Sequence, residues 1–508
     1  MTSLTSFCKG NPILRTDKPL SFLFTILVLM TGFCDSAQAQ YKQVRGIIHL
    51  DTSVSGGTYD PEQMVRFLEE QGLQVAIFSD QITTGIKYGT FPARGLMESM
   101  TGWLAAKKFG RPSSVSTFGA NNYLSLLSEL NRKYKDMVVI PGVEVFPYYY
   151  WQGSLLQNNL TLKNGYKHLL AIGLESPQDY IQMPTIGEGF YREYGLQTLL
   201  SLWPVVLLFL ALKCWRKARR STRPSIFKIS ALIFLIVGFL FLLNNYPYKF
   251  GRYTPYHADA GYAPYQDFIN YVVDRGGLVF WAHPEVSSDT PYQIGPFKIT
   301  LKTDAPYEDL LHLHNYTGFA AFYEGMKYVI PPGGIWDQVL TEYCLGGRAH
   351  PIWAITEGDV EGDSFDPNLC QTAFLVKQND RSEIMKSLKE GRIYALSGPL
   401  ANSLKLENYE LKGGGTSAGM GQTLEAQSVQ LLAHIVLQDS TQENRSLSVE
   451  LIKNGVLLDT FKGEGDITIT YDDTLTNTNR LHYYRLDVRA PHQSRLLTNP
   501  IFVRVPKS

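Results

Sequence analysis

Cysteine and net charge are the two things that this sequence has little of. Its 508 residues include 5 cysteines, and 47 lysines and arginines balance 47 aspartates and glutamates. A chain without a basic excess has no electrostatic footprint for nucleic acid, so we expect no nucleic-acid partner. The sequence also has no paired C-x-x-C, no glycine-rich phosphate loop and no serine nucleophile elbow, which excludes the commonest thiol, nucleotide and serine-hydrolase chemistries.

The few cysteines say little about a disulfide. After residue 40 only Cys214, Cys344 and Cys370 remain. An oxidising compartment would permit a bond between Cys344 and Cys370, but the sequence does not establish one.

Residues 1–40 have the features of an export signal. Arg15 and Lys18 precede an apolar run from Leu20 to Phe33, and Ala37-Gln38-Ala39 offers a small-residue cleavage site. The run is short for a membrane-spanning helix. We therefore predict a signal peptide over 1–40, with an uncleaved N-terminal anchor as the alternative, and expect the rest of the chain to be exported.

Two apolar stretches, 196–212 and 229–243, approach the length needed to cross a membrane. The segment 213–228 between them is basic and has no acidic residue; its cations are Lys213, Arg216, Lys217, Arg219, Arg220, Arg223 and Lys228. Basic loops stay in the cytoplasm, so 196–243 is predicted to be a transmembrane hairpin with the cytoplasmic loop 213–228. A buried hairpin of soluble helices would leave these cations unexplained. The protein is thus expected in the inner (cytoplasmic) membrane, with its main domains on the periplasmic side and the lipid bilayer as a partner.

Residues 46–80 predict a strand, a helix and a second strand. One apolar run ends at Ile48 and another covers 75–78, with an amphipathic helix beginning at Pro61 between them. Polar residues end both strands, namely His49 and Asp51 after the first and Asp80 and Gln81 after the second. In a parallel α/β protein the ends of neighbouring strands meet at one edge, where the chemistry is placed.

Four later strands also carry polar residues at an end. Glu144 follows the strand 137–140, His168 opens the strand 167–174, His283 ends the strand 277–282, and Asp359 and Glu361 follow the strand 352–356. Taken alone, each of these residues could instead have no functional role, as a solvated carboxylate or a packed core histidine.

The motifs resemble those of the polymerase-and-histidinol-phosphatase (PHP) family of metal-dependent phosphoesterases. That family opens with H-x-H-T-x-x-S-D-G and uses strands ending in D-H, P-G-x-E, A-H-P and G-S-D-x-H. Here P-G-V-E and A-H-P are present, but the second histidine is Asp51, Gly56 replaces an aspartate, and Gln81 and Glu361 replace histidines. The resemblance implies a metal site with altered ligands, consisting of His49, Asp51, Asp80, Gln81, Glu144, His168, His283, Asp359 and Glu361. It also implies that Asp359 or Glu361 orients the attacking water as base.

Asp51, Gln81 and Glu361, which stand where the family has histidine, all have side chains with oxygen donors. A carboxylate-rich set favours Mn²⁺, Mg²⁺ or Ca²⁺ over Zn²⁺. Several carboxylates meeting without a cation would repel one another, so the set argues for divalent metal ions.

Beyond residue 399 the pattern changes to short alternating strands, at 429–437, 448–453, 467–471, 483–488 and 501–505, with an Asn454-Gly455 hairpin turn. This segment, 399–508, is predicted to be an all-β sandwich and resembles the one appended to exported PHP-like metallohydrolases of the carbaryl-hydrolase type. The fold class is then α/β, with a distorted PHP-type (β/α)7 barrel from 41–195 and 244–398 that the transmembrane hairpin 196–243 interrupts.

We expect a metal-dependent hydrolase, foremost a phosphoesterase. The alternatives are an inactive PHP-like binding module and a hydrolase of non-phosphate ester or carbamate bonds. The hairpin leaves after the fourth strand and returns before a helix, which is a connection on the face that holds the strand ends. The mouth of the site is therefore expected to face the membrane, as suits a lipid-linked or membrane-surface substrate.

Overall fold

A computed structural model describes residues 41–83, 85–109, 113–186, 195–246, 248, 251–256, 258–294, 297–359, 365–438, 444–476 and 480–506. Residues 42–508 form one compact unit. The predicted signal peptide, 1–40, lies outside the described residues.

The first three strands of the described residues are parallel; they are β1 (Lys42–Leu50), β2 (Val75–Phe78) and β3 (Val138–Ile140). Helix α2 (Pro61–Glu70) joins the first two and begins at Pro61, as the sequence predicts, and Asp60 caps it in a capping box with Gln63. Between β2 and β3 lie α3 (Arg94–Phe109), α4 (Val115–Phe118) and α5 (Ala120–Lys133). Gly46 allows β1 and β2 to approach closely, since a Cβ there would lie 2.3 Å from the Val75 carbonyl oxygen.

A second sheet has the order β12-β11-β8-β7-β4. Its strands are β4 (Gly142–Val145), β7 (Leu169–Ile172), β8 (Leu278–Trp281), β11 (Gly318–Phe322) and β12 (Trp353–Thr356). Strand β7 runs antiparallel to both of its neighbours, so its first residues lie where β4 and β8 end. Parallel bridges between Ile48 and Glu357 and between Gln81 and Glu144 link both edges of this sheet to the strands β1 and β2.

The C-terminal strands continue the first sheet without a break, because β23 pairs with β14. The strands of this 15-stranded sheet that follow β3 are β13 (Cys370–Val376), β14 (Ile393–Ser397), β15 (Leu404–Gly413), β16 (Thr416–Ala418), β17 (Thr423–Glu425), β18 (Ser428–Leu437), β19 (Ser446–Lys453), β20 (Val456–Glu464), β21 (Asp466–Thr474), β22 (Leu481–Arg489), β23 (Arg495–Thr498) and β24 (Ile501–Arg504). The predicted strands and the Asn454-Gly455 hairpin are confirmed. The barrel, the sandwich and their boundaries stay predictions.

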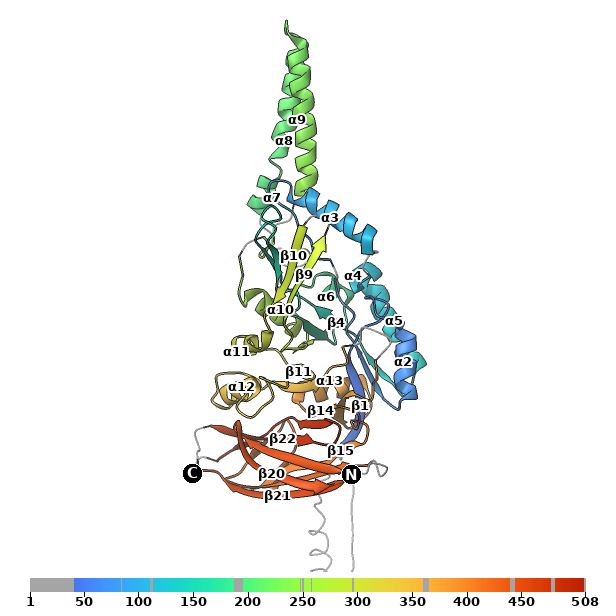
Figure 1. Cartoon of the computed structure of the whole chain (residues 1–508), viewed down its shortest axis with the longest axis vertical. Coiled ribbons are helices and arrows are strands. Elements are labelled where there is room, and N and C mark those ends of the chain that lie inside the picture. Colours follow the sequence, from blue (N-terminus) through green and yellow to red (C-terminus); the bar gives the residue numbers. More distant parts are fainter. Residues whose placement is uncertain are drawn as a thin grey trace, which may run out of the picture. The chain divides into compact units, whose positions relative to one another are not determined.

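The remaining elements surround these sheets (Figure 1). A small sheet has the order β5-β6-β10-β9, with β5 (Tyr150–Gln152), β6 (Leu160–Lys163), β9 (Ser288–Ile294) and β10 (Phe297–Thr303). The further helices are α6 (Pro177–Ile181), α10 (Ala263–Val273), a 3-10 turn (Pro306–Glu308), α11 (Asp309–His312), α12 (Ile335–Cys344) and α13 (Arg381–Glu390).

The predicted apolar hairpin is formed by α7 (Gly195–Ser201), α8 (Pro204–Ala218) and α9 (Pro224–Asn245), and Figure 1 shows α8 and α9 side by side. Two segments, Leu199–Ala218 and Pro224–Asn245, are long and apolar enough to cross a membrane, with mean hydropathies of 1.6 and 2.7. The prediction differs in one respect. Helix α8 continues through Lys213–Ala218, so several of the basic residues lie on its last turns rather than in a loop.

The disulfide that the sequence permits is not formed. Cys344 and Cys370 are separate buried thiols, and burial raises the pKa of each to about 12.

The C-terminal strands are fastened to the rest by a buried ion pair. Arg485 on β22 donates from Nε to Asp337 Oδ1 (2.8 Å) and from Nη2 to Asp337 Oδ2 (2.6 Å) on α12. The same guanidinium bonds the Ile330 carbonyl and lies 4.7 Å above the Trp336 ring. Both side chains of the pair are buried, so water cannot take the place of either partner.

Replacing Arg485 should therefore be costly. The change Arg485→Met keeps much of the volume but leaves Asp337 buried and unpaired, and we expect a loss of about 3–5 kcal/mol in the free energy of unfolding. Chemical denaturation of the purified chain in detergent measures it. The control Arg66→Ala removes the exposed pair with Glu70 and should cost less than about 1 kcal/mol. Equal effects of the two changes would contradict this account of the interface.

Candidate metal centre

The site lies where β1, β2, β4, β8 and β12 end and β7 begins. A bulge between Ile48 and Leu50 interrupts the pairing of β1 with β2, and His49 within it adopts a left-handed backbone, with φ 71°. Bulges re-aim side chains beside functional sites. His283 and Asp359 also have positive φ, 26° and 44°. Such backbone strain persists only where the surroundings enforce it, and it concentrates at functional sites.

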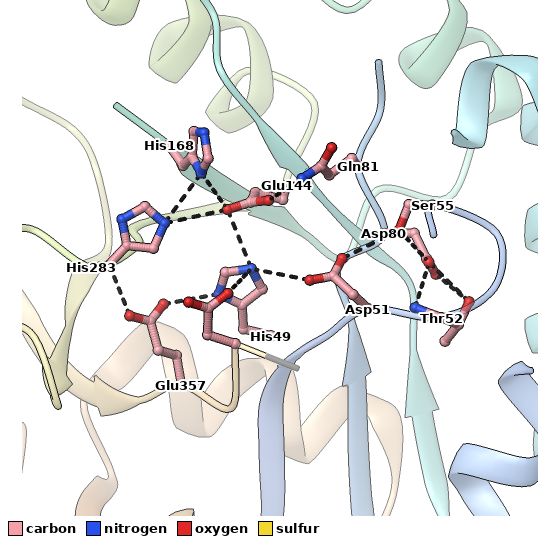
Figure 2. Close-up of polar contacts among 11 residues, drawn as sticks. His49, Asp51, Thr52, Ser55, Asp80, Gln81, Glu144, His168, His283 and Glu357 are labelled. Carbon is pink, nitrogen blue, oxygen red and sulfur yellow. Dashed lines mark hydrogen bonds and ion pairs between the residues drawn. The ribbon is translucent and has the colours of Figure 1, made fainter. Parts of the chain in front are cut away.

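The carboxylate of Glu144 is the centre of the cluster (Figure 2). Its Oε1 lies 2.6 Å from His168 Nδ1, 3.5 Å from His283 Nε2 and 3.4 Å from His49 Nε2. Gln81 donates from Nε2 to its other oxygen, at 3.3 Å. The reversed direction of β7 is what brings His168 here, because that histidine precedes its strand whereas the others follow or end theirs.

His49 faces several carboxylates at once. Its Nε2 lies 3.7 Å from Asp51 Oδ2 and 3.8 Å from Asp359 Oδ1, in addition to Glu144. None of these is a hydrogen bond, and Nε2 is buried without a hydrogen-bond partner. Buried polar atoms are normally paired, so an unpaired ring nitrogen surrounded by carboxylate oxygens is what an absent cation would leave.

Two groups of side chains have the arrangement needed to hold a metal ion, and both include Glu144. The first is Glu144, His168 and His283, and the second is His49, Asp51 and Glu144. All five residues are buried, and within each group the ligand atoms lie within 4.8 Å of one another. The donor set therefore fits divalent ions at two adjacent positions that share one carboxylate.

The electrostatics point the same way. Burial by itself lowers the pKa of His49, but Glu144, Glu357 and Asp359 outweigh it and hold this pKa well above its ordinary value. For His283 burial acts likewise, and the hydrogen bond with Glu144 raises the pKa to about 9. Burial raises the pKa of Asp51 well above its usual range. Burial would also raise the pKa of Glu144, yet the histidines hold it well below. The ionised forms of these buried carboxylates thus require positive charge nearby.

That charge comes from histidine within the part of the chain that the structure describes. The ion pairs of Asp51, Glu144, Glu357 and Asp359 there are all with His49, His168 or His283. Histidine must be neutral to bind a metal, so an ion would take over the role that ring protons otherwise fill.

Glu357 is a site residue that the sequence reasoning missed. It directly follows β12, and its Oε2 lies 2.9 Å from His49 Nδ1 while its Oε1 accepts from the backbone N–H of His283 at 2.8 Å. A carboxylate on the second ring nitrogen fixes the tautomer and orientation of a ligand histidine. The available signal was its position at the strand end, two residues before Asp359.

Three other predicted residues lie differently. Both oxygens of Asp80 accept hydrogen bonds from Thr52, and Oδ1 also accepts from Ser55. This buried carboxylate is thus hydrogen-bonded to the loop after β1. Asp359 is half-exposed at the edge of the cluster. Glu361 lies outside the described residues. The metal-ligand roles of all nine predicted residues stay predictions, and no ligand group in the described residues includes Asp80, Gln81 or Glu361.

No protein-family model and no curated protein matches this sequence. One similar solved structure is a two-domain protein from Bacteroides vulgatus that contains a predicted PHP-like metal-dependent phosphoesterase; it is 12% identical, with 91% of this chain and 95% of that chain covered and a TM-score of 0.35. Another is a candidate metal-dependent phosphoesterase from Bifidobacterium adolescentis, 14% identical, with coverages of 63% and 90% and a TM-score of 0.26. A third, the C-terminal domain of Wzt, is 10% identical, with coverages of 22% and 78% and a TM-score of 0.17. Because the TM-scores are this low, these similarities decide neither the fold nor the function of this chain.

Glu357 should influence metal binding without being a ligand itself. Removing its charge with Glu357→Gln loosens the orientation of His49, and we expect divalent-ion affinity to fall by about 10–100-fold, as for other partners of ligand histidines. Calorimetric titration with Mn²⁺ measures the affinity. The control Glu324→Gln removes a half-exposed carboxylate near His283 that does not bond to His49. If both variants bind Mn²⁺ like the unmodified chain, the orienting role of Glu357 is wrong.

Proposed function

We propose that this chain is a metal-dependent hydrolase of the PHP type, acting as a phosphoesterase and held at the membrane by α8 and α9. The observation that carries the proposal is the shared carboxylate of Glu144, which belongs to both prospective ligand groups. Two ions about 3.5–4 Å apart are the common arrangement in phosphatases and nucleases, where a bridging carboxylate holds them together. A distorted (β/α)7 barrel and a C-terminal sandwich of the carbaryl-hydrolase type belong to the same proposal.

The residues suit hard divalent ions. Asp51, Glu144 and Asp359 contribute oxygen donors, with His49, His168 and His283 as nitrogen donors. This mixture favours Mn²⁺ or Mg²⁺ over Zn²⁺, and Ca²⁺ remains compatible. When bound, such ions polarise a phosphoryl oxygen and lower the pKa of the attacking water.

The protein's own groups then have distinct roles. Asp359 is the proposed base, because its half-exposed carboxylate borders the cluster and can accept a proton from a water that enters from solvent. Glu357 holds the His49 ring through Nδ1 and so directs Nε2 toward Asp51 and Glu144. Glu361 is proposed as a second orienting carboxylate on the basis of its sequence position alone.

Membrane attachment is part of the proposal. The two apolar segments support it, because only 17% and 11% of their most apolar parts are buried by the protein. The basic residues between the segments support it as well. Since basic residues favour the cytoplasmic side, the catalytic and C-terminal parts would lie in the periplasm. A lipid-linked or membrane-surface substrate fits this location.

A binding protein without turnover is the second candidate, and one observation favours it. Asp80 accepts hydrogen bonds from Thr52 and Ser55, and the amide of Gln81 donates to Glu144. Neither side chain is therefore oriented to bind a further metal ion. A chain with this arrangement can hold ions and a ligand without hydrolysing it. Hydrolysis of carboxyl-ester or carbamate bonds is the third candidate, and it depends on the resemblance of the C-terminal segment.

A substrate panel separates these candidates. The purified full chain with Mn²⁺ is given a phosphomonoester, a phosphodiester, a carboxyl ester and a carbamate. We expect hydrolysis of a phosphoester, and Asp359→Asn should lower kcat by about 10²–10⁴-fold because a general base is lost. Release of the leaving group is followed by absorbance, and Mn²⁺ content is measured in parallel.

The control for this panel is Asp289→Asn, an exposed carboxylate on β9 that pairs with Lys302. It should leave kcat unchanged. Bound Mn²⁺ with no turnover of any ester would support the binding protein instead. Turnover of the carboxyl ester or the carbamate alone would support the third candidate.

A further inference from the structure

Helix α3 is attached to the end of the apolar hairpin. The Asn244 side chain, on the last turn of α9, accepts a hydrogen bond from the backbone N–H of Leu96 at 3.3 Å and donates one to the Pro92 carbonyl at 3.1 Å. Gly95 lets the two helices touch, because a Cβ there would lie 2.1 Å from the Asn244 carbonyl oxygen. Figure 1 shows α3 beginning beside the end of α9. The start of α3 is thus fixed at the level where the segment Pro224–Asn245 ends.

The face of α3 that packs on the protein is polar. Arg94, Glu98 and Thr101 are spaced i, i+4 and i+7, so they share one side of the helix. The Arg94 guanidinium lies 4.7 Å above the Tyr256 ring, and the Tyr256 hydroxyl donates to Glu98 at 2.7 Å. The Thr101 hydroxyl lies 3.2 Å from the Tyr88 carbonyl, although its nearest acceptor is the Met97 carbonyl at 2.8 Å. These contacts fix the rotation of the helix about its axis.

On the opposite side, the first three turns of α3 carry apolar side chains that point away from these contacts. Leu96, Met100 and Trp103 have the same i, i+4, i+7 spacing, about half a turn from the polar set. Met100 is 53% exposed and Trp103 61%, and Phe91, just before the helix, is 83% exposed. A surface helix of a soluble protein turns its apolar stripe toward the core, so the arrangement of α3 is inverted.

We propose that α3 is an interfacial helix that lies on the membrane surface with Met100 and Trp103 in contact with lipid. The inference rests on the proposed insertion of α8 and α9, because α3 begins in contact with the end of α9. A helix fixed beside the end of a membrane span, with tryptophan and methionine facing outward, has the position of an interfacial anchor. The anchor would restrain the tilt of the periplasmic part over the bilayer.

Lipid photocrosslinking in the full chain tests this. Met100, Trp103, Ile236 or Leu345 is replaced, one at a time, by p-benzoylphenylalanine, and each protein is reconstituted into vesicles of phosphatidylethanolamine and phosphatidylglycerol. All four sites are exposed, so the bulky residue is tolerated. Ile236 on α9 reports insertion of the hairpin, and Leu345, directly after α12, is the matched exposed site away from α3. Lipid adducts are identified by mass spectrometry.

We expect lipid adducts at Met100, Trp103 and Ile236 and none at Leu345. Adduct at Ile236 alone would overturn the proposal for α3 while leaving the hairpin in the membrane. Absence of adduct at all four sites would overturn both. Crosslinking does not require turnover, so failure of the proposed hydrolase activity would leave this result unchanged.

Discussion

The interaction on which the site depends is the attraction of buried carboxylates for positive charge. Glu144 is enclosed by three histidines, and Asp51 lies beside it with little access to water. Burying a charge is costly unless a partner compensates it, and here the compensating partners are ring nitrogens that ordinarily lose their protons near neutral pH. A divalent cation would compensate the same carboxylates with more positive charge in a smaller volume. The unpaired Nε2 of His49 marks where such a cation would bind.

Strand direction places these side chains. The site collects the last residues of strands that run one way and the first residue of β7, which runs the other way. His49 lies in the bulge of β1, and its side chain and that of Asp51 meet at the Glu144 carboxylate. Glu357 completes the arrangement from β12 by holding His49 and the backbone of His283 together. His49 and Glu357, which this contact joins, lie 308 positions apart in the sequence.

Much of this follows from sequence pattern, and some of it could not. The strands that lead to His49 and His283 are predictable because short apolar runs end in polar residues. The strand that carries Glu144 is not: the prediction of one strand over 137–140 misses β4, a separate strand in the second sheet. The direction of β7 is not, because an apolar run reads the same for either pairing. Nor could the sequence show that Thr52 and Ser55 satisfy Asp80, since that competition depends on how the loop folds back. Strand β20 was missed because its outward side chains, beginning with the exposed Val456, lack the alternation of a half-buried strand.

The most direct test of the central claim is equilibrium uptake of Mn²⁺ by the purified full chain and by Glu144→Gln, with Asp80→Asn as the matched change. The account predicts saturable binding by the unmodified chain, loss of that binding in Glu144→Gln, and retention in Asp80→Asn, because the Asp80 oxygens are held by Thr52 and Ser55. No uptake by the unmodified chain, or unchanged uptake by Glu144→Gln, would contradict it.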